Sequence, residues 1–130
     1  MIKVDVKKQS NYPINSPSLK KIVRDFFTKN GIVSNAEVSI VLVGETKMFD
    51  LGKKYLKDKI LHNVLSFTEE EMQKKFVYPP DNIIRLGEIV ICYPKAFEEA
   101  KAEGKLIDDK IKELVEHGAL HLLGIHHEDN

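Results

Sequence analysis

Apolar and polar positions recur along this chain at regular intervals, and the intervals predict a series of short strands and helices. Positions 2–6 alternate between apolar and charged side chains, which is the period of a strand with one buried face. After Ser16 the apolar positions recur every three to four residues until Gly31, which predicts a helix with Ser16 as its N-cap. The β-branched run at 38–43 predicts a second strand.

The rest of the chain continues this pattern. The remaining predicted elements are helices at 45–56, 94–104 and 107–123, a short strand at 63–67, a polar loop at 68–82 and a strand at 83–92. The strand at 83–92 is the most apolar, so we expect it near the centre of the sheet. Together the elements predict a single α+β domain over residues 1–130, with a mixed sheet of about four strands and helices packed on it.

The composition narrows the class of protein. The chain has 130 residues, of which 42% are hydrophobic, and this length suits one hydrophobic core. It contains no apolar run long enough to span a membrane, and its alternating start does not resemble a signal peptide. Cys92 is the single cysteine, so no internal disulfide can form and a reducing cytoplasm is expected. The formal net charge is zero, which by itself neither favours nor excludes nucleic acid.

The most informative feature is a cluster of histidines in the final segment HGALHLLGIHHEDN. His117 and His121 are four residues apart on the predicted last helix, so their rings share one face, about 6 Å apart along the axis. Gly124 can end the helix with a positive φ and turn the chain back, which would bring His127 to the same point. The spacing therefore predicts a three-histidine site for one zinc ion. His127 is preferred to the adjacent His126 because it matches the spacing after the glycine turn.

Three histidine ligands leave the fourth coordination position of zinc open, which is typical of a catalytic site. The open position would hold a zinc-bound water, whose pKa the metal lowers to about 7. The pattern H-x-x-x-H-x-x-G-x-x-H also has the ligand spacing of the metzincin metalloproteases, but Gly118 stands where these enzymes carry their catalytic glutamate. The sequence therefore favours a zinc hydrolase that does not cleave peptides.

Three segments resemble signatures of the YbeY family of rRNA-maturation endoribonucleases. The segment at 117–127 is similar to H-G-x-L-H-L-x-G-Y-D-H, the segment at 63–67 to T-[DN]-V-L-S-F, and the segment at 86–91 to L-G-D-I-[VA]-I. The matches keep their order and spacing across residues 36–128. The resemblance implies a zinc-dependent, single-strand-specific endoribonuclease of 16S rRNA 3′-end maturation and ribosome quality control. It also implies rRNA and small ribosomal subunit components as partners, a bacterial cytoplasm and no membrane.

The resemblance implies zinc bound by His117, His121 and His127. One departure concerns the substrate side, because Leu56 follows Tyr55 where the family usually has an arginine, a candidate phosphate ligand. Lys57 and Lys59 are the cations that could replace it, as point charges rather than bidentate donors. Such lysines are also common on solvated helix faces.

Two further residues complete the candidate site. Glu88, on the apolar strand, is a candidate general base, and a solvated acid is the alternative interpretation. Ser66, in the segment at 63–67, is a candidate phosphate contact. Two other functions stay open, namely a non-catalytic ribosome-associated zinc protein and a metallohydrolase of another substrate. Leu56 favours the first of these, and Gly118 counts against a peptide substrate for the second.

Overall fold

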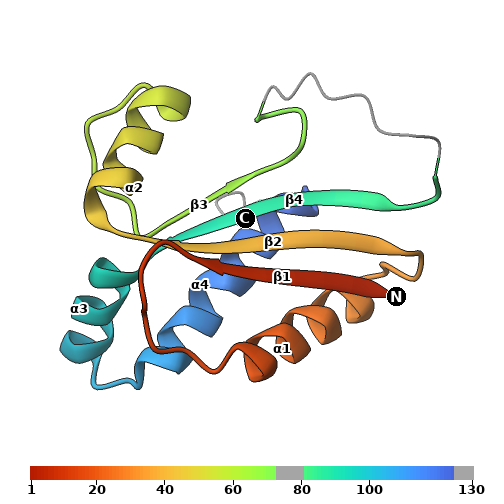
Figure 1. Cartoon of the computed structure of the whole chain (residues 1–130), viewed down its shortest axis with the longest axis horizontal. Coiled ribbons are helices and arrows are strands. Elements are labelled where there is room, and N and C mark those ends of the chain that lie inside the picture. Colours follow the sequence, from red (N-terminus) through yellow and green to blue (C-terminus); the bar gives the residue numbers. More distant parts are fainter. Residues whose placement is uncertain (73–80, 125–130) are drawn as a thin grey trace.

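The computed structural model of this chain describes residues 1–72 and 81–124, which form one four-stranded sheet with helices packed on it (Figure 1). The strands are β1 (Ile2–Lys8), β2 (Ala36–Val43), β3 (Val64–Phe67) and β4 (Ile84–Cys92). The helices are α1 (Ser16–Lys29), α2 (Glu45–Leu51), the π-helix η1 (Gly52–Leu56), α3 (Tyr93–Glu103) and α4 (Ile107–Leu122). The predicted α+β class and mixed sheet are confirmed. No helix in this part of the chain is long and apolar enough to cross a membrane.

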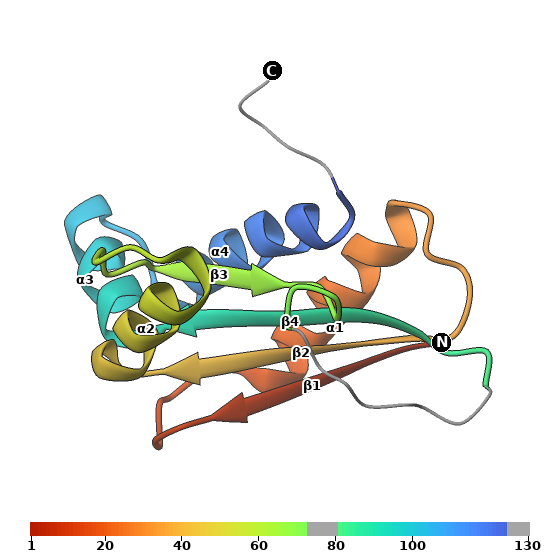
Figure 2. The same ribbon diagram turned by 90° about the horizontal axis from the view of Figure 1, so that it is seen from above.

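The strands lie in the order β1-β2-β4-β3, with β1, β2 and β4 parallel and β3 antiparallel to β4. Figure 2 shows β1 and β3 at the two edges of the sheet. The internal position of β4 follows from its composition, because its last four residues, from Ile89 to Cys92, are all buried. A strand buried on both faces is a continuous apolar run, as the sequence predicted.

The two faces of the sheet carry different helices. Leu19 and Phe27 of α1 and Ile111 of α4 pack with Ile89 in one core cluster. Met48 of α2 packs in a second cluster with Val90 and Cys92. The side chains of these two residues point to the face of the sheet opposite that of Ile89. Helices α1 and α4 therefore cover one face of the sheet, and α2 covers the opposite face (Figure 1).

The predicted N-cap of α1 is wrong by one residue. Asn15, not Ser16, caps the helix, because its side-chain Oδ1 accepts a hydrogen bond of 3.1 Å from the backbone amide of Ser18. Pro17 then lies inside the first turn, where its missing N–H costs nothing since the first amides of a helix lack partners within the helix.

A buried lysine ties α4 to its neighbours. Lys110 is 4% exposed, and its Nζ lies 3.1 Å from Glu103, 3.3 Å from Glu113 and 3.5 Å from Glu99. Burial alone would lower the pKa of Lys110, but the carboxylates of Glu103 and Glu113 outweigh this effect and raise the pKa. Glu99 also accepts a 2.9 Å hydrogen bond from Asn63, the residue before β3. The lysine cluster therefore fixes α4 relative to both α3 and β3.

Strand β4 contains an irregularity at Gly87, which explains the glycine of the LGEIVI segment. The register between β2 and β4 shifts between Glu37 and Val38, and Gly87 has a φ of 132°. A Cβ at this position would overlap the carbonyl oxygen of Phe67 and lie 2.9 Å from Leu122 Cδ2. A residue without a side chain is therefore needed where the end of β3 and the end of α4 meet β4.

We expect Gly87→Ala to lower the free energy of unfolding by about 3–5 kcal/mol, because backbone strain and overpacking add. Gly104→Ala is the matched control. Gly104 also has a positive φ, of 69°, but a Cβ there would meet no atom within 4 Å. The control should cost only about 1 kcal/mol. Urea denaturation of both variants checks this, and equal losses would contradict the steric role of Gly87.

Candidate functional site

A pocket of about 640 Å³ lies along the edge of the sheet formed by β3. Three separate parts of the chain form most of its wall, namely residues 54–57, all four residues of β3, and one face of α4. Glu71, shortly after β3, completes the wall. The pocket thus combines residues that lie more than sixty positions apart in the sequence, from 54 to 121.

Helix α4 contributes His117, Gly118 and His121 to the pocket. A Cβ at Gly118 would lie 2.9 Å from Ile89 Cγ2 and 3.5 Å from Ser66 Cβ, so this turn of the helix packs directly on the sheet. The histidines on either side of Gly118 are thereby held at the β3 edge. Gly124 has a φ of 79°, the positive value that the sequence predicted for the end of this helix.

The opposite wall begins where α2 changes into the π-helix η1 at Gly52. The sequence predicted one continuous helix over 45–56, but the following loop folds back onto Gly52, where a Cβ would lie 3.1 Å from Asp58 Oδ1. Asp58 Oδ2 and His62 Nε2 are 2.8 Å apart and hold this loop closed. Lys57 ends η1 with a φ of 58° and lines the pocket. A π-helix followed by a left-handed residue is typical of a functional site.

Aromatic and apolar side chains make the same wall suitable for a flat ring. The rings of Tyr55 and Phe67 lie 4.7 Å apart at a tilt of 47°, and Lys54 Nζ lies 5.1 Å from the centre of the Tyr55 ring. Leu56, which is 48% exposed, also lines the pocket. Lysines beside aromatic rings are the combination that binds a nucleobase together with its phosphate.

A carboxylate faces the histidine side of the pocket. Glu71 Oε1 lies 3.2 Å from His121 Nε2 and accepts a 2.9 Å hydrogen bond from the backbone amide of Thr68. Burial alone would raise the pKa of Glu71, but the Thr68 amide and the His121 ring outweigh it and hold the pKa below its usual value. The carboxylate is therefore ionised at neutral pH beside a histidine nitrogen.

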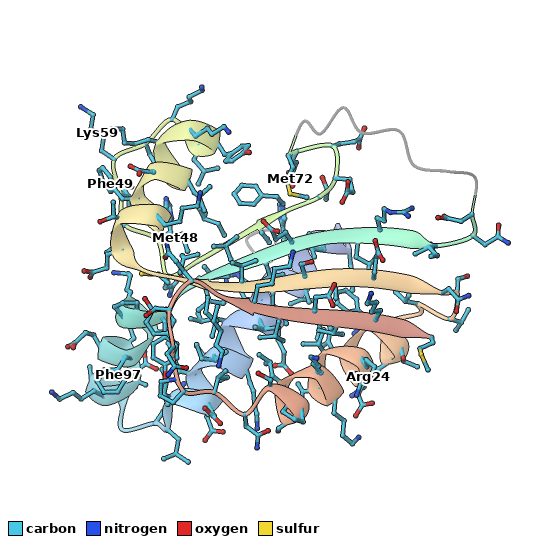
Figure 3. The ribbon with its side chains drawn as sticks, viewed as in Figure 1. Arg24, Met48, Phe49, Lys59, Met72 and Phe97 are labelled. Atoms are coloured by element: carbon cyan, nitrogen blue, oxygen red, sulfur yellow. The ribbon has the colours of Figure 1, made fainter. Side chains whose placement is uncertain are left out.

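The structure brings several predicted site residues together and leaves others apart. The residues that line the pocket are His117, His121, Lys57 and Ser66. Glu88 and Lys59 are not among the lining residues. Glu88 neighbours Ile89, which packs with α4, so its side chain lies on the face of the sheet opposite α4, where Glu88 pairs with Phe67. Lys59 projects outward beyond the loop (Figure 3). His127 lies outside the described residues.

The pocket contains donor atoms of two types that zinc takes in proteins. Within residues 1–72 and 81–124 no three histidine, cysteine, aspartate or glutamate side chains converge as a metal-binding group. Two imidazoles and one carboxylate nevertheless line the same pocket, and these are donor types that zinc takes in catalytic sites. The predicted third ligand, His127, follows the glycine turn and would have to complete the set.

A likeness to a solved structure defines the class of fold. The solution structure of TM1509 from Thermotoga maritima matches this chain with a TM-score of 0.61, over 98% of this chain and 76% of that protein. The two sequences are 24% identical, so this likeness concerns the fold alone.

Sequence comparisons then define the family. The family model described as Endoribonuclease YbeY matches residues 5–130. Among the relatives of that name, one from Dehalococcoides mccartyi is 36% identical over 98% of this chain and 78% of its own length. Another, from Renibacterium salmoninarum, is 34% identical over 97% of this chain and 80% of its own length. The chain belongs to the endoribonuclease YbeY family.

Sequence reasoning did not single out Glu71. The pattern Thr68-x-x-Glu71 is a capping box, which predicts that the glutamate folds back on the threonine. The reciprocal hydrogen bond, from the Glu71 amide to Thr68 Oγ1, measures 3.2 Å. The pattern therefore contained a local signal for the orientation of Glu71, but no signal that His121 lies beside it.

We expect Gly118→Ala to destabilise the wild-type chain, because the new methyl group would press on the stiff Ile89 side chain. Overpacking costs about 1–3 kcal/mol, which exceeds the gain in helix propensity of about 1 kcal/mol. In an Ile89→Ala background the clash is gone, so Gly118→Ala should become neutral or stabilising. Urea denaturation of all four chains gives the coupling energy. The same loss in both backgrounds would show that Ile89 does not set the helix position.

Proposed function

We propose that this chain is a zinc-dependent, single-strand-specific endoribonuclease that acts on the 3′ end of 16S rRNA and in ribosome quality control. Its family makes it an enzyme that cleaves RNA phosphodiester bonds. One observation carries the more specific proposal. His117 and His121 lie in the same pocket as Lys57 and the Tyr55 ring, so the proposed metal ligands lie beside the proposed RNA-binding groups.

On the metal side, His117, His121 and His127 would hold one zinc ion. The two described histidines are on successive turns of α4. The packing of Gly118 on Ile89 fixes the position of both histidines relative to the sheet. When bound, zinc supplies a Lewis acid that lowers the pKa of water and neutralises phosphate charge. The imidazoles would bind it as neutral ligands.

On the RNA side, Lys57 and Ser66 would contact phosphate, and the aromatic wall would receive a base. A base can enter this pocket only if it is not already stacked in a helix. The bases of a duplex are stacked and paired inside it, whereas those of a single strand can turn outward. Stacking on Tyr55 tolerates any base, because every base has a π-face. These properties support a preference for single-stranded RNA rather than for one sequence.

The decisive experiment uses a structured rRNA fragment that carries a single-stranded 3′ tail. We expect the purified chain to cut the tail, a chelator to stop cleavage, and added zinc to restore it. His121→Ala should lower the rate at least 100-fold, because it removes a metal ligand. Far-ultraviolet circular dichroism would show whether the variant keeps its fold.

Other outcomes would favour the alternative functions. Tight RNA binding without cleavage would support a non-catalytic ribosome-associated zinc protein. Cleavage of an unstructured peptide by the same sample would support a metallohydrolase of another substrate. Cleavage of the RNA tail that persists in the chelator would contradict zinc dependence.

The two predicted cationic residues give a matched pair of variants. Both lysines are exposed and both variants lose one charge, but Lys57 lines the pocket and Lys59 is not among its lining residues. We expect Lys57→Gln to weaken binding of the RNA tail about 3–10-fold. It should also reduce the slope of log affinity against log salt by about 0.7, which is one phosphate contact. Lys59→Gln should change neither quantity, and fluorescence titration at several salt concentrations measures both. Equal effects of the two variants would mean that only overall charge matters.

A further inference from the structure

All four residues of β3 line the pocket, although consecutive side chains of a strand point to opposite faces of the sheet. Leu65 and Phe67 pack in the cluster on the α2 side, whereas Ser66 lies against α4, where its Cβ is 3.5 Å from a Cβ placed at Gly118. A cavity can reach side chains of both faces only at the edge of a sheet. The backbone of β3 therefore lies along the pocket, between the aromatic rings on one side and α4 on the other.

The pairing of β3 with β4 determines which backbone groups of β3 face the pocket. The Cys92 amide donates a 2.9 Å hydrogen bond to the Asn63 carbonyl, which makes these two residues a hydrogen-bonded pair. Such pairs alternate along an antiparallel ladder, so Leu65 bonds to β4 whereas Val64 and Ser66 do not. Because β3 is an edge strand, the N–H and C=O groups of Val64 and Ser66 point outward. Among residues 1–72 and 81–124, no other group forms a hydrogen bond with them.

The chemistry of these outward groups favours a nucleobase over a phosphate. A phosphate oxygen only accepts hydrogen bonds, so it would bind the N–H of Ser66 and be repelled by the carbonyl oxygen beside it. The Watson–Crick edge of every base carries both donors and acceptors, and it is free only in an unpaired nucleotide. A peptide strand could also pair with the edge of β3, but Lys54 and Lys57 in the same pocket suit the phosphates of RNA. The pocket therefore fits an unpaired nucleotide better than a peptide.

We propose that the outward N–H and C=O groups of Ser66 bind the Watson–Crick edge of an unpaired base that stacks on Tyr55, which rests on the RNA side of the proposed function. Ser66 is beside the aromatic rings, since it precedes Phe67, whose ring lies 4.7 Å from that of Tyr55. The N–H donates to an acceptor of the base, and the carbonyl accepts from a base N–H. All four bases can pair in this way, whereas a base already paired in a duplex cannot. The backbone of β3 thus selects single-stranded RNA without selecting a sequence.

Fluorescence titration of the full chain with methylated oligouridine tests this proposal. A methyl group on N3 of uracil blocks the Watson–Crick edge but leaves the ring face and the phosphate charge in place. The chain should bind oligo-N3-methyluridine about tenfold or more weakly than oligouridine. Oligo-5-methyluridine is the matched control, because its methyl group lies away from that edge, and it should change the affinity less than about twofold. Equal affinities for the two methylated strands would overturn the proposal.

A backbone ester at Ser66 tests the protein side of the same contact. The ester removes the N–H of Ser66 and keeps its side chain, so it should weaken oligouridine binding about threefold or more. It should lower the melting temperature less than an ester at Leu65, which removes a hydrogen bond to β4. The effect of the N3-methyl group should shrink in the Ser66 ester, because both changes remove one contact, and an unchanged effect would contradict the assignment to Ser66.

The remaining outcomes separate this inference from the proposed function. Oligouridine that is bound and cut regardless of the N3-methyl group would overturn the inference alone. If the Ser66 ester weakened the binding of an extended peptide instead, the edge of β3 would serve a protein strand and the inference would be wrong. No binding of oligouridine by the wild-type chain would overturn the RNA side of the proposed function, and the inference with it.

Discussion

The close contact between α4 and the sheet at Gly118 is the constraint on which the site depends. A side chain at this position would collide with Ile89, so the helix can approach the sheet only with a glycine there. The approach places His117 and His121 at the open edge of β3, where the pocket forms. The same contact leaves no room for a glutamate beside the first histidine. The packing that builds the site therefore also removes the general base of a metalloprotease.

Regular patterns made most of the fold predictable from the sequence. The period of apolar positions predicted strands and helices because each element buries one face, or two in the case of β4. The predictions were less accurate where two neighbouring residues can cap a helix about equally well. They were also less accurate where contacts with a distant part of the chain determine the local structure. Asn15 and Ser16 are both good N-caps, and sequence alone did not separate them. The change from α2 to a π-helix depends on a later loop that returns to Gly52.

The candidate site was predictable only in part, for a related reason. The histidine pair follows from helix geometry, so its shared face could be deduced from spacing. Lys57 and Lys59 are only two residues apart, and their spacing in the sequence does not show that Lys57 lines the pocket while Lys59 does not. Glu71 and Glu88 are both plausible acids in the sequence. Only the three-dimensional pairing of the turn after β3 with α4 shows that Glu71 faces His121.

The charges that line the pocket connect the binding of a metal ion with the binding of RNA phosphate. Lys54 and Lys57 lie on one wall and Glu71 on another, and the chain as a whole has a net charge of zero. Without a bound cation, the ionised Glu71 would repel a phosphate that approaches His121. A divalent ion at His121 would reverse the local sign and turn the same wall into an attractive one. A metal ion here would therefore affect substrate binding as well as chemistry, because the chain carries no net charge that would attract RNA to the pocket.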